Sequence, residues 1–161
     1  MNKANAFNKP ILQAILVADH IYTDKMSGKN IVAGIFHDLY FFDPQQLQQL
    51  TESGKAPLPF APGQRSGSPY AYVSLTEVHG NQQFQLRYVN VANEKLHFDC
   101  NLDVQCKDPL ATVELIVPLP ALPANEPGAF ALELLWKGEP LGSFRIAVKQ
   151  MKLPEPGDTQ S

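Results

Sequence analysis

The sequence predicts an all-β protein, an antiparallel β-sandwich of the immunoglobulin-like or C2-like kind with about seven to nine strands. Apolar and polar residues alternate with a period of two through several short segments, which is the pattern of half-buried strands. Turn-forming residues separate these segments at near-regular intervals. The chain has 161 residues, 44% of them apolar, which is enough to bury one core without disulfides or metals.

The first predicted element is a hairpin. Its strands are ILQAILVADHIY and NIVAGIFHDLYF, and Asp24, Ser27 and Gly28 supply the turn between them. Both strands are apolar on both faces over much of their length, and a strand of this kind is normally covered on both sides. We therefore expect the hairpin to lie beneath the long loop that follows it or to meet another subunit.

The strand pattern breaks over residues 43–69. Asp43 followed by Pro44 is a good helix start, because an acceptor side chain caps the first turn and proline fits its first position. Gly54 suits the end, so one short helix is expected over QQLQQL. The stretch KAPLPFAPGQRSGSP that follows is rich in proline, glycine and serine, which predicts a surface loop.

Period-two alternation or β-favouring composition returns after this loop and predicts the remaining strands. They lie within residues 70–78, 84–88, 96–107, 112–117, 130–136 and 144–149. The stretch PLPALPANEPG carries four prolines and is interpreted as a crossover between two strands. The alternative is a polyproline ligand for an SH3-type domain, through Pro120 and Pro123.

The two cysteines lie on one predicted strand. Cys100 and Cys106 share its inward face about 20 Å apart, too far for a disulfide in a straight strand. We interpret them as small core residues of a protein in a reducing compartment, and we expect the cytoplasm. ILQAILVA does not resemble a signal peptide, because Gln13 interrupts it and no small residues mark a cleavage site.

Composition narrows the classes of partner. The net charge is −3 and the basic residues are scattered, which argues against nucleic acid. No apolar run approaches the ~18 residues that a membrane span needs, so no membrane association is expected. We expect a flexible N-terminus (1–10), one domain (11–150) with the helix and proline-rich loop at 43–69, and a flexible tail (151–161).

Two Asp–His neighbours flank the first turn. Successive side chains on a strand face opposite ways, so neither Asp19 and His20 nor His37 and Asp38 can share one site. A turn centred near residues 26–27 places residues 19–20 opposite 33–35, and places His37 and Asp38 further along, beside or near Leu16 and Val17. A zinc site needs convergent ligands, so we expect surface or satisfied core residues here.

A second candidate is the polar row on the strand at 96–107. His97, Asp99, Asn101 and Asp103 share one predicted face, where they could hold a cation weakly or supply paired carboxylates. A solvated strand face has the same composition. The metal candidates are therefore only weak ones: Asp19, His20, His37, Asp38, His97 and Asp99.

Several segments resemble one bacterial family, a group of small β-sandwich proteins defined only as a domain of unknown function. The similar segments are ADHIYTDKMSGKNIVAGIFHDL, PYAYVSLTEVHG, LRYVNV and DPLATVELIVPLPALPANEPGAFALELLWKGEPLGSFRIAV, within about residues 11–149. The last of these is also similar to the closing hairpin of many immunoglobulin-like sandwiches. The resemblance implies a small bacterial β-sandwich and brings no catalytic residues.

Catalytic signatures are missing from the sequence. It has no Gly-x-Ser-x-Gly elbow, and GQRSGS lacks the lysine and following helix of a phosphate-binding loop. We therefore expect no enzyme and no cofactor, but a module acting through protein–protein contacts and a candidate homodimer. The alternative is a sandwich that binds carbohydrate or Ca²⁺ through loops at one end, including residues 55–69. A hydrolase with an unrecognised site ranks third.

Overall fold

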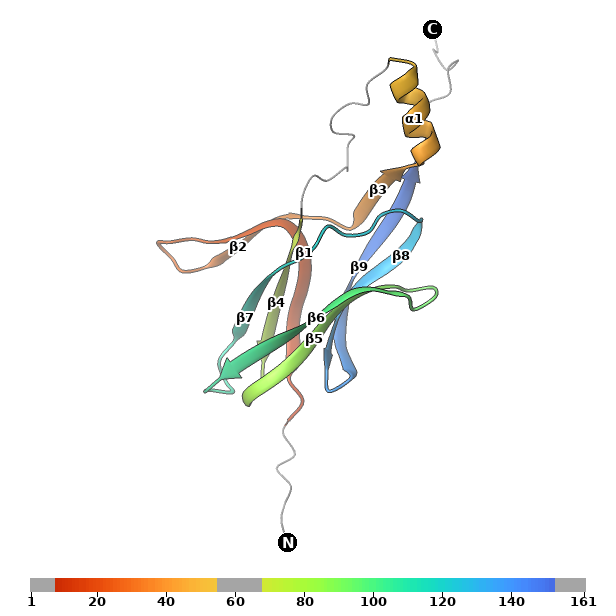
Figure 1. Ribbon diagram of the computed structural model, residues 1–161. Helices are drawn as coiled ribbons and strands as arrows, with labels where there is room; N and C mark the ends of the chain where they lie inside the picture. The colour runs from red at the N-terminus through yellow and green to blue at the C-terminus, as the bar shows by residue number, and fades with distance from the viewer. Residues whose placement is uncertain (1–7, 55–67, 153–161) are drawn as a thin grey trace.

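Nine strands and one short helix form two β-sheets in the computed structural model, which describes residues 8–54 and 68–152 (Figure 1). The four-stranded sheet has the order β2-β1-β4-β7 and consists of β1 (Ile11–Thr23), β2 (Asn30–Ile35), β4 (Tyr70–Thr76) and β7 (Val113–Pro118). The five-stranded sheet has the order β3-β9-β8-β5-β6 and consists of β3 (Asp38–Phe42), β5 (Gly80–Asn90), β6 (Leu96–Cys106), β8 (Gly128–Trp136) and β9 (Glu139–Met151). The expectation of a sheet-rich fold with about seven to nine strands is confirmed.

One strand pair departs from the predicted antiparallel arrangement. β3 runs parallel to β9, with Asp38 opposite Ala147 and Phe42 opposite Met151. The other strand pairs of the described residues are antiparallel. A parallel pair needs a long connection, and here residues 43–138 lie between its two members.

The predicted second strand of the first hairpin is two strands in different sheets. Phe36 still donates its backbone N–H to Val17 of β1, over 3.4 Å. The next residue, His37, accepts a backbone hydrogen bond from Ala147 of β9, over 2.8 Å. The chain thus leaves the four-stranded sheet and enters the five-stranded one within two residues.

The core lies between the two sheets and is built by the alternation that the sequence predicts. Inward-facing side chains of β5 and β8 are fully buried and meet those of β1 and β4. The largest of them are Tyr88, Phe84, Phe130, Leu75, Leu86, Leu132 and Leu134. Cys106 is buried and Cys100 is half-buried, in agreement with their predicted inward positions on β6. Both thiols are free.

The helix α1 (Pro44–Glu52) follows β3 at one end of the molecule (Figure 1). Asp43 caps it, because its Oδ1 accepts the backbone N–H of Gln45 at 2.9 Å, and Gly54 ends it with φ +70°. The predicted helix is confirmed at both ends. Most of the proline-rich loop and of the predicted flexible ends lies outside the described residues.

No helix within residues 8–54 and 68–152 has the length and apolar character that crossing a bilayer requires.

Candidate functional site

The hairpin register agrees with the prediction from the sequence. Ala18 lies opposite Ile35 and His20 opposite Ala33, while Thr23 lies opposite Asn30 next to the turn. At the turn, Asp24 accepts the backbone N–H of Ser27 at 2.9 Å, as the predicted turn residues imply. His20 is exposed on the opposite face of β1 from Asp19.

The second Asp–His neighbour lies elsewhere than predicted. Asp38 pairs with Ala147 on β9, so the expectation that it and His37 lie beside Leu16 and Val17 is wrong. The reason is the change of sheet after Phe36, which removes these residues from the hairpin. The His37 ring stacks on Phe144 with centroids 4.8 Å apart.

Asp38 forms an ion pair with Lys149. Its Oδ1 lies 2.7 Å from Nζ of that lysine, and this hydrogen bond with the nearby charge raises the pKa of Lys149. The same ammonium lies 5.9 Å from the Tyr40 ring centroid. The carboxylate therefore has a structural partner on the neighbouring strand, and both members of the pair are partly exposed.

A β-bulge separates His97 from the polar row in which the sequence placed it. Tyr88 of β5 lies opposite Phe98, but the next residue, Val89, lies opposite Leu96, so His97 is the extra residue on β6. Its side chain is only 9% exposed. The prediction that His97 shares an outward face with Asp99 is therefore wrong.

His97 packs instead among aromatic rings. Its centroid lies 5.2 Å from that of Phe130 and 6.0 Å from that of Tyr88. Its Nε2 lies 3.8 Å from Oε1 of Glu126, too far for a hydrogen bond. The Nε2 atom and the Tyr88 hydroxyl are both buried without a hydrogen-bond partner among the described residues. Burial raises the pKa of Tyr88 far above its usual range, so the phenol stays neutral.

The candidate ligands do not gather. Asp19 and His20 lie on the hairpin, Asp38 pairs with Lys149, and His97 is turned inward. Within the part of the chain that the structure describes, no group of three or more His, Cys, Asp or Glu side chains is arranged to hold a metal ion. Burial, with the charge of Asp99 adding to it, also raises the pKa of the Cys100 thiol, which disfavours the reactive thiolate.

The outer face of the five-stranded sheet is polar and carries cross-strand pairs. Gln83 donates from Nε2 to Asp103 at 2.9 Å, and Gln85 donates from Nε2 to Asp99 at 2.8 Å. Further along β5, Nε of Arg87 lies 2.7 Å from Glu133. Asp99 thus serves as an acceptor in a ladder of side-chain pairs across β5 and β6.

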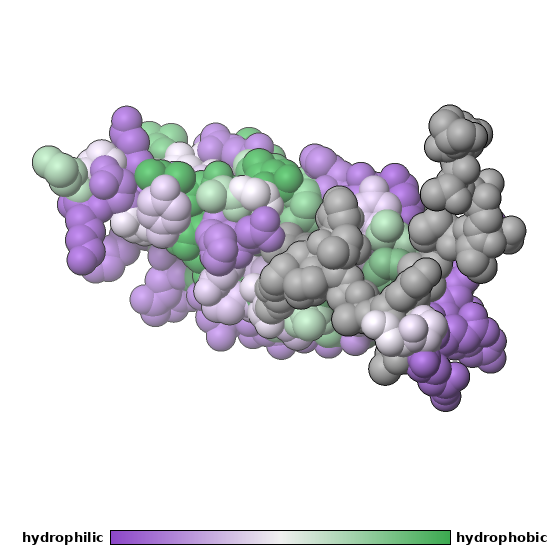
Figure 2. All heavy atoms as spheres, turned by 90° about the horizontal axis from the view of Figure 1, so that it is seen from above, coloured by the Kyte–Doolittle hydropathy of each residue, from purple (hydrophilic) through white to green (hydrophobic). Residues whose placement is uncertain are grey.

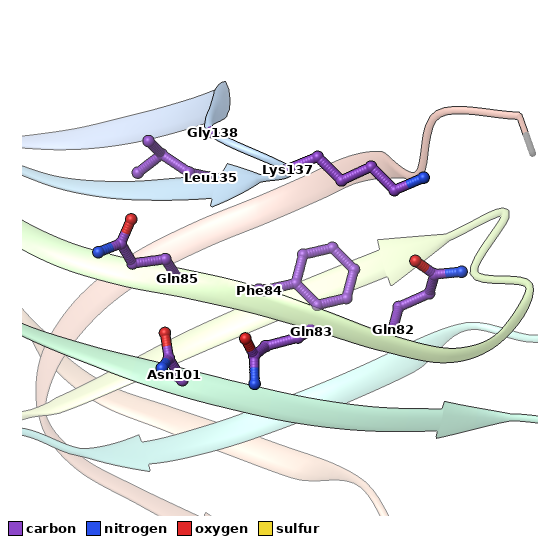
Figure 3. Close-up of a pocket in the computed structure, with 8 residues that line it drawn as sticks. All are labelled: Gln82, Gln83, Phe84, Gln85, Asn101, Leu135, Lys137 and Gly138. Carbon is purple, nitrogen blue, oxygen red and sulfur yellow. The ribbon is translucent and has the colours of Figure 1, made fainter.

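A shallow groove of about 420 Å³ lies on this polar face. Figure 3 shows Gln83, Gln85 and Asn101 standing on β5 and β6, with Leu135 and Lys137 opposite them. Below it, the Trp136 indole donates to Oε1 of Gln82 at 3.0 Å and is only 7% exposed. The groove offers neutral amides and one ammonium, and Trp136 is not among the residues that line it.

The outer face of the four-stranded sheet has the opposite character. Pairing places Ile11 of β1 opposite Thr76, Leu16 opposite Tyr72, and Tyr72 opposite Ile116. By strand alternation the same face continues along β1 to Tyr22. The β2 residues that pair with this side of β1, Ile31 opposite Tyr22 and Ile35 opposite Ala18, also lie on it. Five of the eight exposed large apolar side chains of the described residues lie on it: Ile11, Tyr22, Ile31, Ile35 and Ile116. We call the outward residues of β1, β2, β4 and β7 the apolar face.

Charge is nearly missing from the apolar face. Among its described residues the one acidic group is Glu114, and its carboxylate accepts a short hydrogen bond from the Tyr72 hydroxyl. That bond and, above all, burial raise the pKa of Tyr72. Exposed apolar side chains that gather on one face of a sheet are typical of interaction sites.

The hairpin extends the apolar face beyond the body of the molecule. β1 pairs with β4 only from Ile11 to Ala18, and from there to Thr23 it pairs with β2 alone. Figure 1 shows the hairpin projecting sideways, and Figure 2 shows green, apolar side chains exposed on the same left-hand side. Met26 at its tip is 97% exposed.

The sequence carried a partial signal for this surface. The two-sided apolar character of the hairpin indicated that something must cover it, but the contribution of Ile116 was missed. β7 alternates as a strand with one polar face would, apart from Ile116 and Pro118 on its outward side. Only its pairing with β4 brings Ile116 next to Tyr72.

Comparison with known proteins adds no family. No protein-family model matches the chain, and no significant relative is found among curated proteins.

Proposed function

We propose that this protein is a non-enzymatic β-sandwich module that acts through protein–protein contacts made by its apolar face. The observation that carries the proposal is the concentration of exposed apolar side chains on one sheet, while the opposite sheet is polar. Burying such side chains stabilises an association by roughly 25 cal/mol per Å² of apolar surface, before the costs of association. A hydrolase is less well supported, because no group of three or more His, Cys, Asp or Glu side chains gathers within the described residues.

The proposal extends to an immunoglobulin-like fold. Its support is the strand order β9-β8-β5-β6 in one sheet and β1-β4-β7 in the other, which parallels the G-F-C-C′ and A-B-E strands of variable-type domains. The chain differs from antibody domains in its core: both cysteines lie on β6, and the tryptophan lies on β8. The motifs that resemble the bacterial family of unknown function support membership of that family as a further part of the proposal.

A cytoplasmic location is also part of the proposal. Its support is the pair of free thiols, Cys100 and Cys106, which share one strand and cannot bridge each other. Free cysteines in a protein core suit a reducing compartment.

A second candidate function is favoured by the groove on the five-stranded sheet. Side-chain amides such as Gln83, Gln85 and Asn101 donate and accept hydrogen bonds, as recognition of a neutral, hydroxyl-rich ligand such as a carbohydrate requires. It ranks below protein contacts because the groove is shallow and offers no exposed aromatic ring for stacking. A set of soluble oligosaccharides that raises the thermal midpoint through binding would favour it.

Site-specific photo-crosslinking tests the contact function. A photoreactive phenylalanine derivative is placed at Tyr22 on the apolar face or at Ser143, an exposed position on the outward side of β9. In the cells that produce this chain, we expect protein adducts from position 22, either to the chain itself or to another protein, and none above background from position 143. Equal yields from both positions would refute the proposal.

A further inference from the structure

The apolar face is well suited to a partner that carries no complementary charge. Its one acidic side chain, Glu114, is engaged by Tyr72, and its one basic side chain is the exposed imidazole of His20 on β1; the described part of the face has no lysine or arginine. A partner recognised through several charges would find only the His20 imidazole to pair with here. A copy of the same face meets the requirement, because both surfaces are mostly apolar and carry few ionisable groups, and a net charge of −3 per chain repels only weakly.

The hairpin also distinguishes two ways in which copies could meet. β2 is an edge strand whose sequence, NIVAGI, has no charge or proline to protect it, whereas the edge strands β3, β6 and β7 each contain an acidic residue. Gly34, with φ +74°, interrupts this edge after four residues. Edge-to-edge pairing would be short, and it would leave Tyr22 and Ile116 in water.

Packing of one apolar face on another would bury more surface than edge-to-edge pairing. β1, β4 and β7 lie about 4.8 Å apart and the seven residues of β4 extend about 24 Å, so this part of the face covers roughly 350 Å². The six residues of β2, paired with β1, add roughly 190 Å². Two copies would then cover about 1,000 Å² together, at the lower bound for a specific interface.

We infer that the partner of the apolar face is a second copy of this chain. The inference rests on the proposed contact function and names its partner. The two four-stranded sheets pack face to face across a two-fold axis, about 10 Å apart, with Tyr22 and Ile31 of each hairpin lying against the partner. An interface of this size falls among weak, reversible contacts.

Sedimentation velocity of the full chain from about 1 to 200 µM tests the inference, since this range brackets a micromolar dissociation constant. We expect a monomer–dimer equilibrium. Tyr22→Lys and Ile31→Lys each place two charges in the symmetric interface and should raise the dissociation constant at least about 100-fold. Ser143→Lys adds the same charge to the other sheet and should leave it unchanged. Emission of the buried Trp136 reports whether each variant is folded.

The outcomes separate this inference from the proposed function. A wild-type chain that stays monomeric at 200 µM, or a dimer that neither lysine on the face weakens, overturns the second copy as partner. If position 22 still crosslinks to a different protein, the contact function survives with a foreign partner. If position 22 gives no more adducts than position 143, the contact function itself fails.

Discussion

Gly34 should tolerate no side chain, because two independent constraints meet there. Its φ is +74°, a conformation that costs an L-residue about 1–2 kcal/mol. A Cβ built at this position would lie 2.3 Å from Oδ2 and 2.9 Å from Cβ of Asp19 on the facing strand. Relieving such overlap typically costs about 1–3 kcal/mol. Gly34→Ala should therefore lower the free energy of unfolding of the hairpin by about 2–5 kcal/mol.

Gly28 provides a matched control on the same hairpin. Its φ is +70°, but a Cβ there would meet nothing within 4 Å. Gly28→Ala has only the backbone cost, offset partly by the smaller freedom of alanine in the unfolded chain, and should lose about 1 kcal/mol. The difference between the two variants isolates the steric contribution of Asp19.

Urea denaturation gives the global free energy, and hydrogen exchange of residues 18–35 gives the local one, since a projecting hairpin can open by itself. Asp19→Ala removes Oδ2 and Cγ, so it should recover part of the loss in a double-mutant cycle with Gly34→Ala. If Gly34→Ala and Gly28→Ala differ by less than about 0.5 kcal/mol, or if Asp19→Ala recovers nothing, the steric argument is wrong.

Three further predictions concern the core and the turn. Tyr88→Phe removes a buried hydroxyl that has no hydrogen-bond partner among the described residues. In urea titrations it should leave the free energy of unfolding unchanged or raise it by up to about 2 kcal/mol. A clear loss of stability would contradict the absence of a partner. Gln82→Leu deprives the Trp136 indole of its acceptor and the His79 carbonyl of its donor and should cost about 1–3 kcal/mol, whereas Gln82→Glu, which loses the donor but keeps an acceptor, should cost less. Hydrogen bonds from Ser27 lower the pKa of Asp24, so its stabilising effect is present above the unfolded pKa and is lost as the pH falls through the lower folded one. A carboxyl NMR titration should show this low pKa, and Ser27→Ala should move it back toward the ordinary aspartate value; an unchanged pKa would contradict the assignment.

The alternation of apolar and polar residues predicted most of the strands, because a strand buried on one face of a sheet has an apolar residue at every second position. The segments that contain Phe84, Cys100, Leu132 and Ile146 all became strands with those residues facing inward. The helix was also predictable, since the cap at Asp43 acts over two residues. The hairpin register followed from its turn for the same reason.

Features set by distant contacts were not predictable. NIVAGIFHDLYF is apolar on both faces over much of its length, and nothing within it shows that β2 and β3 join different sheets. That depends on β9, whose Ala147 donates to His37 and pairs with Asp38. The inward orientation of His97 also depends on a distant contact, the pairing of β6 with β5. The β-bulge in this pairing moves His97 to the other face of the sheet, although the apolar–polar alternation of the β6 sequence is unbroken. The candidate metal residues on these segments were therefore placed wrongly in part.

The parallel pair of β3 with β9 has a consequence for synthesis on the ribosome. β3 leaves the ribosome early, but its partner residues, from Ala147 to Met151, are among the last described residues of the chain. At about 5–20 residues per second, β3 waits several seconds for the strand that completes its hydrogen bonds. Its apolar segment, with Leu39, Phe41 and Phe42, is open to wrong pairing during that interval, so translation arrest before residue 147 should yield nascent chains that bind chaperones or aggregate.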